Sequence, residues 1–243
     1  MSRLALLLVF VSTLLNAEVK VQTKTKGEIT CDKVEYSTGM LKVFPEKDNK
    51  FHIKVQIEDV ISVDHQEPVQ VKLLEKYFLE GKGNLIANDK GQKVLEENYH
   101  TGWGRKSAFY LIMAFIKNKE FHAAEKLLKQ ALNQLPGLND KEDRLLLAIA
   151  QSYLNFERAK PKFILADLDK ISVPQTALGK MFYYQLQGRV LEEDMKSTEA
   201  VIAYYKGIMF GVKSEERAQI QDRIEHIYKL QSDPRKLPDL NKI

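Results

Sequence analysis

One short pattern of residues recurs along this chain at a fixed interval of 38 residues. Intervals of about this length are typical of helix-turn-helix units, which cannot bury their apolar faces alone and therefore stack on copies of themselves. The pattern predicts a helical repeat, and because such stacks usually bind other macromolecules it also predicts a binding protein. The four copies are Leu73-Leu74-x2-Tyr77, Leu111-Ile112-x2-Phe115, Ile149-Ala150-x2-Tyr153 and Gln187-Gly188-x2-Leu191.

The first seventeen residues read as an export signal. A basic start at Arg3 precedes an apolar stretch from Leu4 to Leu15, and Asn16-Ala17 offers a cleavage site. The alternative is a retained membrane anchor, but the stretch is shorter than the ~20 apolar residues of a spanning helix. We therefore expect cleavage after Ala17, a periplasmic or secreted protein, and no integral membrane span in the mature chain.

Charge and cysteine content narrow the class of protein. The formal net charge of +4 is too small for a dedicated nucleic-acid binder, so we expect no nucleic-acid partner. Cys31 is the only cysteine in the sequence, which excludes an internal disulfide. Its place in an alternating strand pattern indicates a small buried side chain, with a reactive thiol or an intermolecular bridge as the alternative.

Residues 18–67 alternate between apolar and polar side chains with a period of two, which predicts about five short antiparallel strands. So few strands leave exposed edges, and closing the sheet into a small barrel removes them. The spacing of Gly27-Glu28-Ile29, Leu41-x-Val43 and the run from Asp59 to Val63 resembles that of an SH3-like or Sm-like barrel. This resemblance implies a small β-barrel domain.

Residues 68–231 change to a helical period. In the first segment Val71, Leu74 and Phe78 share one helix face, and a second helix from about residue 84 to 98 is interrupted by Gly91. At the other end, Ser214 is placed to cap a helix that runs to about Leu230. That helix carries an apolar stripe of Ile220, Ile224 and Ile227, as expected of a helix that covers the end of a stack.

The segment from Arg105 to Pro136 resembles a tetratricopeptide repeat. It carries Ala108-x2-Leu111-Ile112-x2-Phe115, a turn at residues 118–120, and Phe121-x2-Ala124-x3-Leu128-x2-Ala131. Ile112 stands where the family prefers glycine, whereas a second good copy keeps glycine at Gly188. A middle copy is poorer because Lys162 occupies the close-contact position. The family period is about 34 residues, so each copy has four extra residues, placed either at residues 137–140 or near Arg158.

The expected fold class is therefore α+β: a small N-terminal antiparallel β barrel followed by a right-handed α-solenoid of tetratricopeptide-like helix pairs with a C-terminal capping helix. The expected divisions are a signal peptide at 1–17, the barrel at 18–67, the helical repeat domain at 68–231 and a flexible tail at 232–243.

The resemblance implies that the first helix of each pair lines a concave face, which binds an amphipathic helix or an extended peptide. The alternative for each side chain is burial between repeats. The family's clamp for a terminal carboxylate is expected to be absent, because Phe109 and Met113 stand where it needs polar groups. The predicted partner-binding residues are Phe78, Phe109, Met113, Ile116, Gln151, Gln185, Arg189 and Glu192.

Candidate catalytic and metal-binding residues are few. His122-x2-Glu125 has the helical spacing of a ligand pair but lacks a second pair, and Asp64-His65-x-Glu67 is an isolated polar cluster. We therefore expect a non-enzymatic scaffold without metal or cofactor, which binds a peptide or protein of the cell envelope. A metal enzyme built around His65 is one alternative. Another is an accessory carbohydrate- or peptidoglycan-binding protein that uses Trp103.

Overall fold

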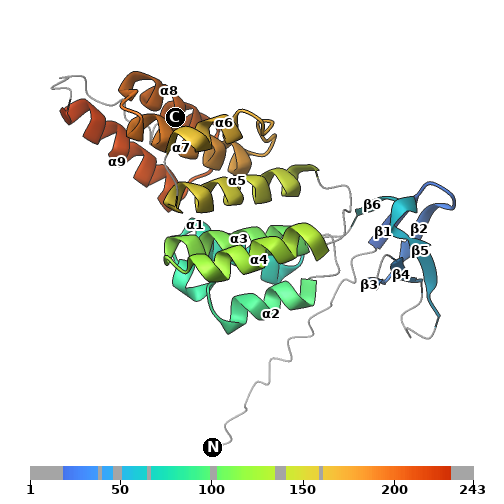
Figure 1. Cartoon of the computed structure of the whole chain (residues 1–243). Helices are drawn as coiled ribbons and strands as arrows, with labels where there is room; N and C mark the ends of the chain where they lie inside the picture. The colour runs from blue at the N-terminus through green and yellow to red at the C-terminus, as the bar shows by residue number, and fades with distance from the viewer. Residues whose placement is uncertain are drawn as a thin grey trace, which may run out of the picture.

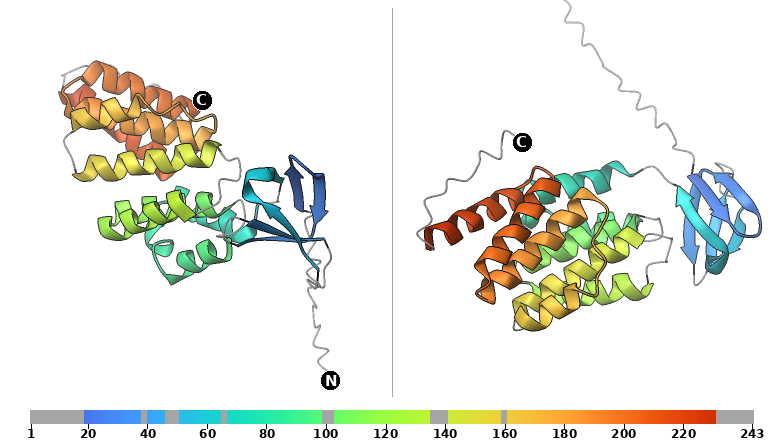
Figure 2. Two further views of the ribbon diagram at one scale, coloured as in Figure 1. Left: turned by 45° about the vertical axis from the view of Figure 1, so that its right-hand side comes forward. Right: turned by 90° about the horizontal axis from the view of Figure 1, so that it is seen from above.

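In the computed structural model, the described residues are 19–37, 40–45, 51–64, 67–98, 103–134, 141–158 and 161–230. They form a strand region beside a larger helical region (Figures 1 and 2). The protein is α+β, as expected. The predicted signal peptide at 1–17 and the predicted tail at 232–243 lie outside the described residues.

The strand region consists of two three-stranded antiparallel sheets. One has the order β2-β1-β6, with β1 at Val19–Thr23, β2 at Gly27–Cys31 and β6 at Val60–Asp64. The other has the order β3-β4-β5, with β3 at Lys33–Ser37, β4 at Met40–Phe44 and β5 at Ile53–Gln56. A 3-10 turn, η1 (Ile57–Asp59), leads into β6.

The predicted closed barrel is therefore wrong for the described strands. The chain bends at Asp32, between β2 and β3, and passes from one sheet to the other. The two sheets instead share a small core, to which Val19 and Val21 contribute from one sheet and Leu41 and Val43 from the other. Cys31 belongs to this core at 2% exposure, and burial raises the pKa of its thiol to about 11. A buried, protonated cysteine matches the expectation of a structural side chain.

The helical region begins with two short helices. Helix α1 spans Val69–Leu79, a 3-10 turn η2 spans Gly83–Leu85, and α2 spans Asp89–Asn98. The helix expected from residue 84 thus starts later, and Gly91 lies in its first turn instead of interrupting it. A methyl group at position 91 would lie 2.0 Å from the carbonyl oxygen of Ile86, so only glycine fits there.

Seven further helices follow in chain order among the described residues. They are α3 (Gly104–Lys117), α4 (Phe121–Gln134), α5 (Lys141–Arg158), α6 (Pro161–Leu168), α7 (Ala177–Glu193), α8 (Ser197–Phe210) and α9 (Glu215–Leu230). Consecutive helices pack as pairs, and the first helices α1, α3, α5 and α7 also pack on their neighbours (Figure 1). Helix α9 packs on α8 and buries Ile220, Ile224 and Ile227, the apolar stripe expected from the sequence.

The 38-residue interval is visible in the backbone. Gly81, Lys119 and Met195 lie one and two intervals apart, and each has a positive φ of 72°, 62° and 59°. After each of them the next amide closes the preceding helix by a hydrogen bond across the turn, a recurrent way to end a helix. These bonds run from Lys82 N to Tyr77 O (2.9 Å), Glu120 N to Phe115 O (2.8 Å) and Lys196 N to Leu191 O (2.8 Å).

Aromatic rings fill the interior where the first helices meet. The ring of Phe182 in α7 lies 5.6 Å from that of Phe78 in α1 and 5.5 Å from that of Phe109 in α3, between centroids. Tyr153 in α5 lies 6.1 Å from Phe182. Four helices from distant parts of the sequence therefore share one cluster of rings, Phe78, Phe109, Tyr153 and Phe182, which we call the aromatic centre. It holds α1 against α7.

Candidate functional site

A cleft of about 250 Å³ opens where α3, α5, α7 and α9 converge. Three of these are first helices of their pairs, and the fourth, α9, is the last helix that the structure describes. Its lining consists of Met113, Ile116, Lys117, Lys119, Tyr153, Glu157, Gln185, Arg189, Glu216, Gln219 and Arg223. We refer to it below as the inner cleft.

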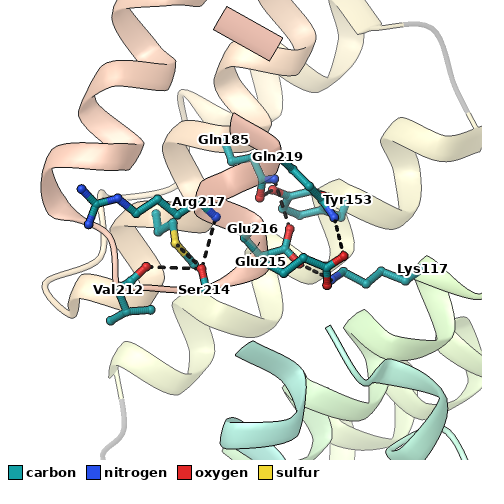
Figure 3. A network of polar contacts seen from close by, with 10 residues as sticks. Lys117, Tyr153, Gln185, Val212, Ser214, Glu215, Glu216, Arg217 and Gln219 are labelled. Carbon is teal, nitrogen blue, oxygen red and sulfur yellow. Dashed lines mark hydrogen bonds and ion pairs between the residues drawn. The ribbon is translucent and has the colours of Figure 1, made fainter. Parts of the chain in front are cut away.

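A buried chain of polar contacts forms the base of the inner cleft (Figure 3). The hydroxyl of Tyr153 donates a hydrogen bond to Gln185 Oε1 at 2.8 Å, and Gln185 Nε2 donates to Glu216 Oε2 at 3.2 Å. The ammonium of Lys117 forms an ion pair with the Glu216 carboxylate. Because Glu216 is only 3% exposed, this ion pair offsets the cost of burying its charge. Burial raises the pKa of Tyr153 well above its usual value, so the hydroxyl remains a donor.

Lys117 also holds the start of α9 against α1 and α3. Its ammonium lies 4.9 Å from the centroid of the Phe78 ring and 3.9 Å from Glu215 Oε2. The turn after α1 comes equally close, since a methyl group at Gly81 would lie 1.7 Å from that same carboxylate oxygen. The first turn of α9 is therefore fixed at the centre of the array, and α9 forms one wall of the inner cleft.

Two further ion pairs cross the rim of the inner cleft. Arg189 in α7 contacts Glu157 in α5, and Arg223 in α9 contacts Glu192 in α7, with nitrogen-oxygen distances of 2.9 and 3.0 Å. Tyr204 in α8 donates a hydrogen bond to the same Glu192 carboxylate at 2.6 Å. These contacts fix the directions of both guanidinium groups. Each is held through a single nitrogen in its ion pair, and an arginine carries five N–H donors.

More cationic than acidic side chains line the inner cleft. Four cations and two carboxylates belong to the lining, and Glu192 and Glu215 pair with Arg223 and Lys117 from its edge. Lys119 forms no ion pair with any residue that the structure describes, and its left-handed backbone places it at the tip of the turn between α3 and α4. Met113 and Ile116, only 3% and 6% exposed, add a small apolar part to the lining. The arrangement fits a ligand that has both a carboxylate and an apolar group.

The structure brings four of the eight predicted partner-binding residues into this cleft: Met113, Ile116, Gln185 and Arg189. Glu192 lies at its edge through the ion pair with Arg223. Gln151 is half-buried, does not line the cleft and donates a hydrogen bond to Asn155.

Phe78 and Phe109 are buried between helices, which is the alternative given above for each predicted partner-binding residue. Both are 0% exposed and belong to the aromatic centre, so neither is available to a partner. The physical reason is that α1 and α7 meet through Phe78 and Phe182, so aromatic rings fill the space between the first helices.

Sequence reasoning missed Lys117, Lys119, Tyr153, Glu157, Glu216, Gln219 and Arg223 as cleft residues. Glu216 is one of two acids in the first turn of α9, a position where solvated carboxylates are common, so the sequence did not single it out. The repeat register offered one clue to these residues. Lys119 and Glu157 lie 38 residues apart, at the same position of the repeat, and both line the inner cleft.

The other sequence candidates have defined environments. Glu125 is held by Arg158 and Lys129, which lower the pKa of its carboxyl to about 2, and His122 is exposed. His65 lies outside the described residues. No cluster of three or more histidine, cysteine or acidic side chains with metal-binding geometry occurs in the described ranges.

Trp103, the candidate for glycan binding, is half-buried, and the ammonium of Lys106 lies 5.6 Å from its ring centroid. Lys106 is itself bound by Glu67 at 2.7 Å and Glu75 at 2.8 Å. One face of the indole is therefore covered by a lysine that two carboxylates hold in place. This contact also ties the link after β6 to α1 and α3.

Comparison with known proteins gave no match to a family model, to a characterised protein or to a solved structure. Among the helices that the structure describes, none has both the length and the apolar character needed to cross a bilayer.

Proposed function

We propose that this chain is an exported, non-enzymatic scaffold that binds a polypeptide of the cell envelope in its inner cleft. The observation that carries the proposal is the convergence of polar groups from four helices on one cleft with an excess of cationic donors. A cleft of about 250 Å³ is smaller than the ~300–1,000 Å³ of most cofactor or drug-sized sites. It suits a few side chains of a polypeptide.

The proposal includes a fold assignment. We infer that the helices form a right-handed solenoid of tetratricopeptide-like pairs, supported by the turn that recurs after α1, α3 and α7. Helical arrays of this kind expose a continuous inner surface to partners.

The partner segment is expected to combine an acidic side chain with a neighbouring apolar one. Arg189 and Arg223 are already oriented by Glu157 and Glu192, so they present donors at little further entropic cost. Lys119 at the rim adds charge that attracts a carboxylate. Met113 and Ile116 offer apolar contact to the next side chain.

The test is site-specific photo-crosslinking in cells followed by mass spectrometry. A photoreactive residue at Gln219, in the inner cleft, is compared with one at Gln92, an exposed glutamine on α2. We expect an envelope protein to be captured from position 219 alone, through a segment that contains acidic residues. Equal capture from both positions, or none from position 219, would contradict the proposal.

A matched pair of charge variants sharpens the result. Lys119→Glu reverses a charge at the rim, whereas Met195→Glu places the same side chain on the same left-handed backbone in the turn after α7. We expect Lys119→Glu to abolish the adduct from position 219 and Met195→Glu to leave it. Loss in both variants would indicate a general effect on the fold.

A further inference from the structure

Helix α8 has an outer face with large apolar side chains that remain exposed. The helix lies at the outer edge of the helical region, on the side away from α3 and α4 (Figures 1 and 2). Its inner face is buried, whereas Ile202 is 52% and Met209 72% exposed. Thr198 is also exposed, and Tyr205 is half-buried.

These four residues follow a coiled-coil spacing. Thr198, Ile202, Tyr205 and Met209 succeed one another at intervals of four, three and four residues, which is the spacing of the contact stripe in a two-stranded coiled coil. Together they form what we call the α8 stripe. A helix whose second face carries such a stripe is suited to packing against another helix.

Two opposite charges flank the α8 stripe on one side. Glu199 and Lys206 are exposed and lie seven residues apart, two helical turns along the same edge. Neither forms an ion pair with another described residue. The Lys206 ammonium instead lies 5.6 Å from the centroid of the Tyr184 ring in α7. Both charges are therefore available to a partner with the complementary pattern.

We propose that the α8 stripe binds the α8 stripe of a second copy of this chain, with the two helices antiparallel. In that register Thr198 faces Met209 of the other copy and Ile202 faces Tyr205, and two-fold symmetry forms each contact twice. The same register brings Glu199 opposite Lys206 on both sides of the symmetry axis. A parallel pairing would instead set Lys206 against Val201, which is buried within its own protomer.

The length of the α8 stripe limits the expected affinity of the dimer. A helix of 14 residues is about 21 Å long, so one helix pair buries less than the ~800 Å² per partner of a standard stable interface. Phe210, 44% exposed and stacked on Tyr184, extends the apolar area at each end. The dimer is therefore reversible and depends on protein concentration, which makes it sensitive to single charges.

The first experiment is sedimentation equilibrium of the purified protein over a wide concentration range. We expect a monomer-dimer equilibrium that Ile202→Asp abolishes, with the helical circular dichroism signal retained because residue 202 faces solvent. A wild-type protein that is monomeric at every concentration would overturn the proposal. If that monomer bound anionic phospholipid vesicles through α8, the face would belong to a membrane, with Lys180, Lys206 and Lys213 as its basic groups.

Charge reversal tests the register. Lys206→Glu and Glu199→Lys each convert two attractive contacts into two repulsive ones, and each should weaken the dimer about tenfold. The double variant restores both pairs and should return the affinity to the wild-type value, and an equimolar mixture of the single variants should form heterodimers. Lys126→Glu on α4 is the matched control and should change nothing. A double variant as weak as the single ones would overturn the antiparallel register.

Discussion

The middle helix pair, α5 and α6, differs from its neighbours at the point where its first helix ends. Helices α3 and α7 end at Lys117 and Glu193, and each is followed by a left-handed residue, Lys119 or Met195. The matching position in the middle pair is Glu157, one interval from each. There the helix continues, and α5 ends only at Arg158.

The extension of α5 places two charged side chains where the regular pairs have a turn. Glu157 reaches Arg189 in α7 across 2.9 Å, and Arg158 reaches Glu125 in α4 across 2.9 Å. One of these ion pairs forms part of the rim of the inner cleft. The pairs α3–α4 and α7–α8 thus share one turn geometry. The irregular pair α5–α6 instead contacts the helices on both sides of it and supplies the Glu157 carboxylate at the candidate site.

The largest expected effect concerns the aromatic centre, to which α5 contributes and α6 does not. Phe182→Ala removes a ring that is 0% exposed and contacts α1, α3 and α5. We expect it to lower the free energy of unfolding by about 3–5 kcal/mol. Phe163→Ala in α6 is the matched control, since its ring is 64% exposed, and should change stability by less than about 0.5 kcal/mol. Urea denaturation of both variants checks the difference, and similar losses would contradict it.

A smaller effect is expected at the repeated close-contact position. A methyl group at Gly188 in α7 would lie 2.4 Å from the Tyr204 ring, whereas α5 carries Ala150 at the same place in the repeat, fully buried. Gly188→Ala should destabilise the protein by about 1–3 kcal/mol through overpacking. The reverse change, Ala150→Gly, should cost about 1 kcal/mol because glycine disfavours a helix interior. Thermal unfolding measures both, and a stabilising Gly188→Ala would show that the α7–α8 pair is not packed as described.

Glycine at the turn position after α3 or α7 should stabilise the protein, whereas glycine at the matching position in α5 should destabilise it. At Lys119 and Met195 the backbone has a positive φ, so glycine should raise the free energy of unfolding by up to about 1 kcal/mol. At Glu157, inside α5, glycine should lower it by about 1 kcal/mol and also remove the ion pair with Arg189. Chemical denaturation of the three variants is the measurement. An increase in stability for Glu157→Gly would mean that α5 ends earlier, as its neighbours do.

Local patterns in the sequence were enough to predict most of the secondary structure. The alternation of apolar residues located the strands, and the stripe of Ile220, Ile224 and Ile227 located the buried face of α9. Barrel closure was predicted wrongly, because whether the two sheets join depends on pairing between strands distant in sequence. The sequence pattern also gave no reason to expect α5 to pass the turn position, since Glu157 and Arg158 are stabilised by partners on other helices.

The candidate site was predictable only in part, for a related reason. Register along the first helices placed Gln185 and Arg189 on one helix face, and both line the inner cleft, because a helix face follows from spacing alone. It could not show that Phe78 in α1 meets Phe182 in α7, or that the start of α9 reaches Lys117 in α3. Both depend on the angles between successive pairs, and those angles arise from packing that no local pattern encodes.

The smallest expected effect tests the second ion pair of the α5 extension. Arg158 is the main cause of the low pKa of Glu125, about 2 against a usual 4.5, with Lys129 as the second cause. A carboxyl whose pKa is lowered by folding adds stability above its unfolded pKa, and loses that contribution as the pH falls from about 4.5 through about 2. Because Glu125 lies at the surface, solvent screens the pair and the change in overall stability is small.

The titration itself is the sharper measurement for this pair. In Arg158→Ala the pKa of Glu125, followed by carboxyl NMR, should move towards its usual value, and it should move less in Lys129→Ala. Added salt should raise the wild-type pKa in the same direction, because mobile ions screen exposed charges. If Lys129→Ala had the larger effect, Arg158 would not be positioned over Glu125, and the extension of α5 would contact its neighbours only through Glu157 on the cleft side.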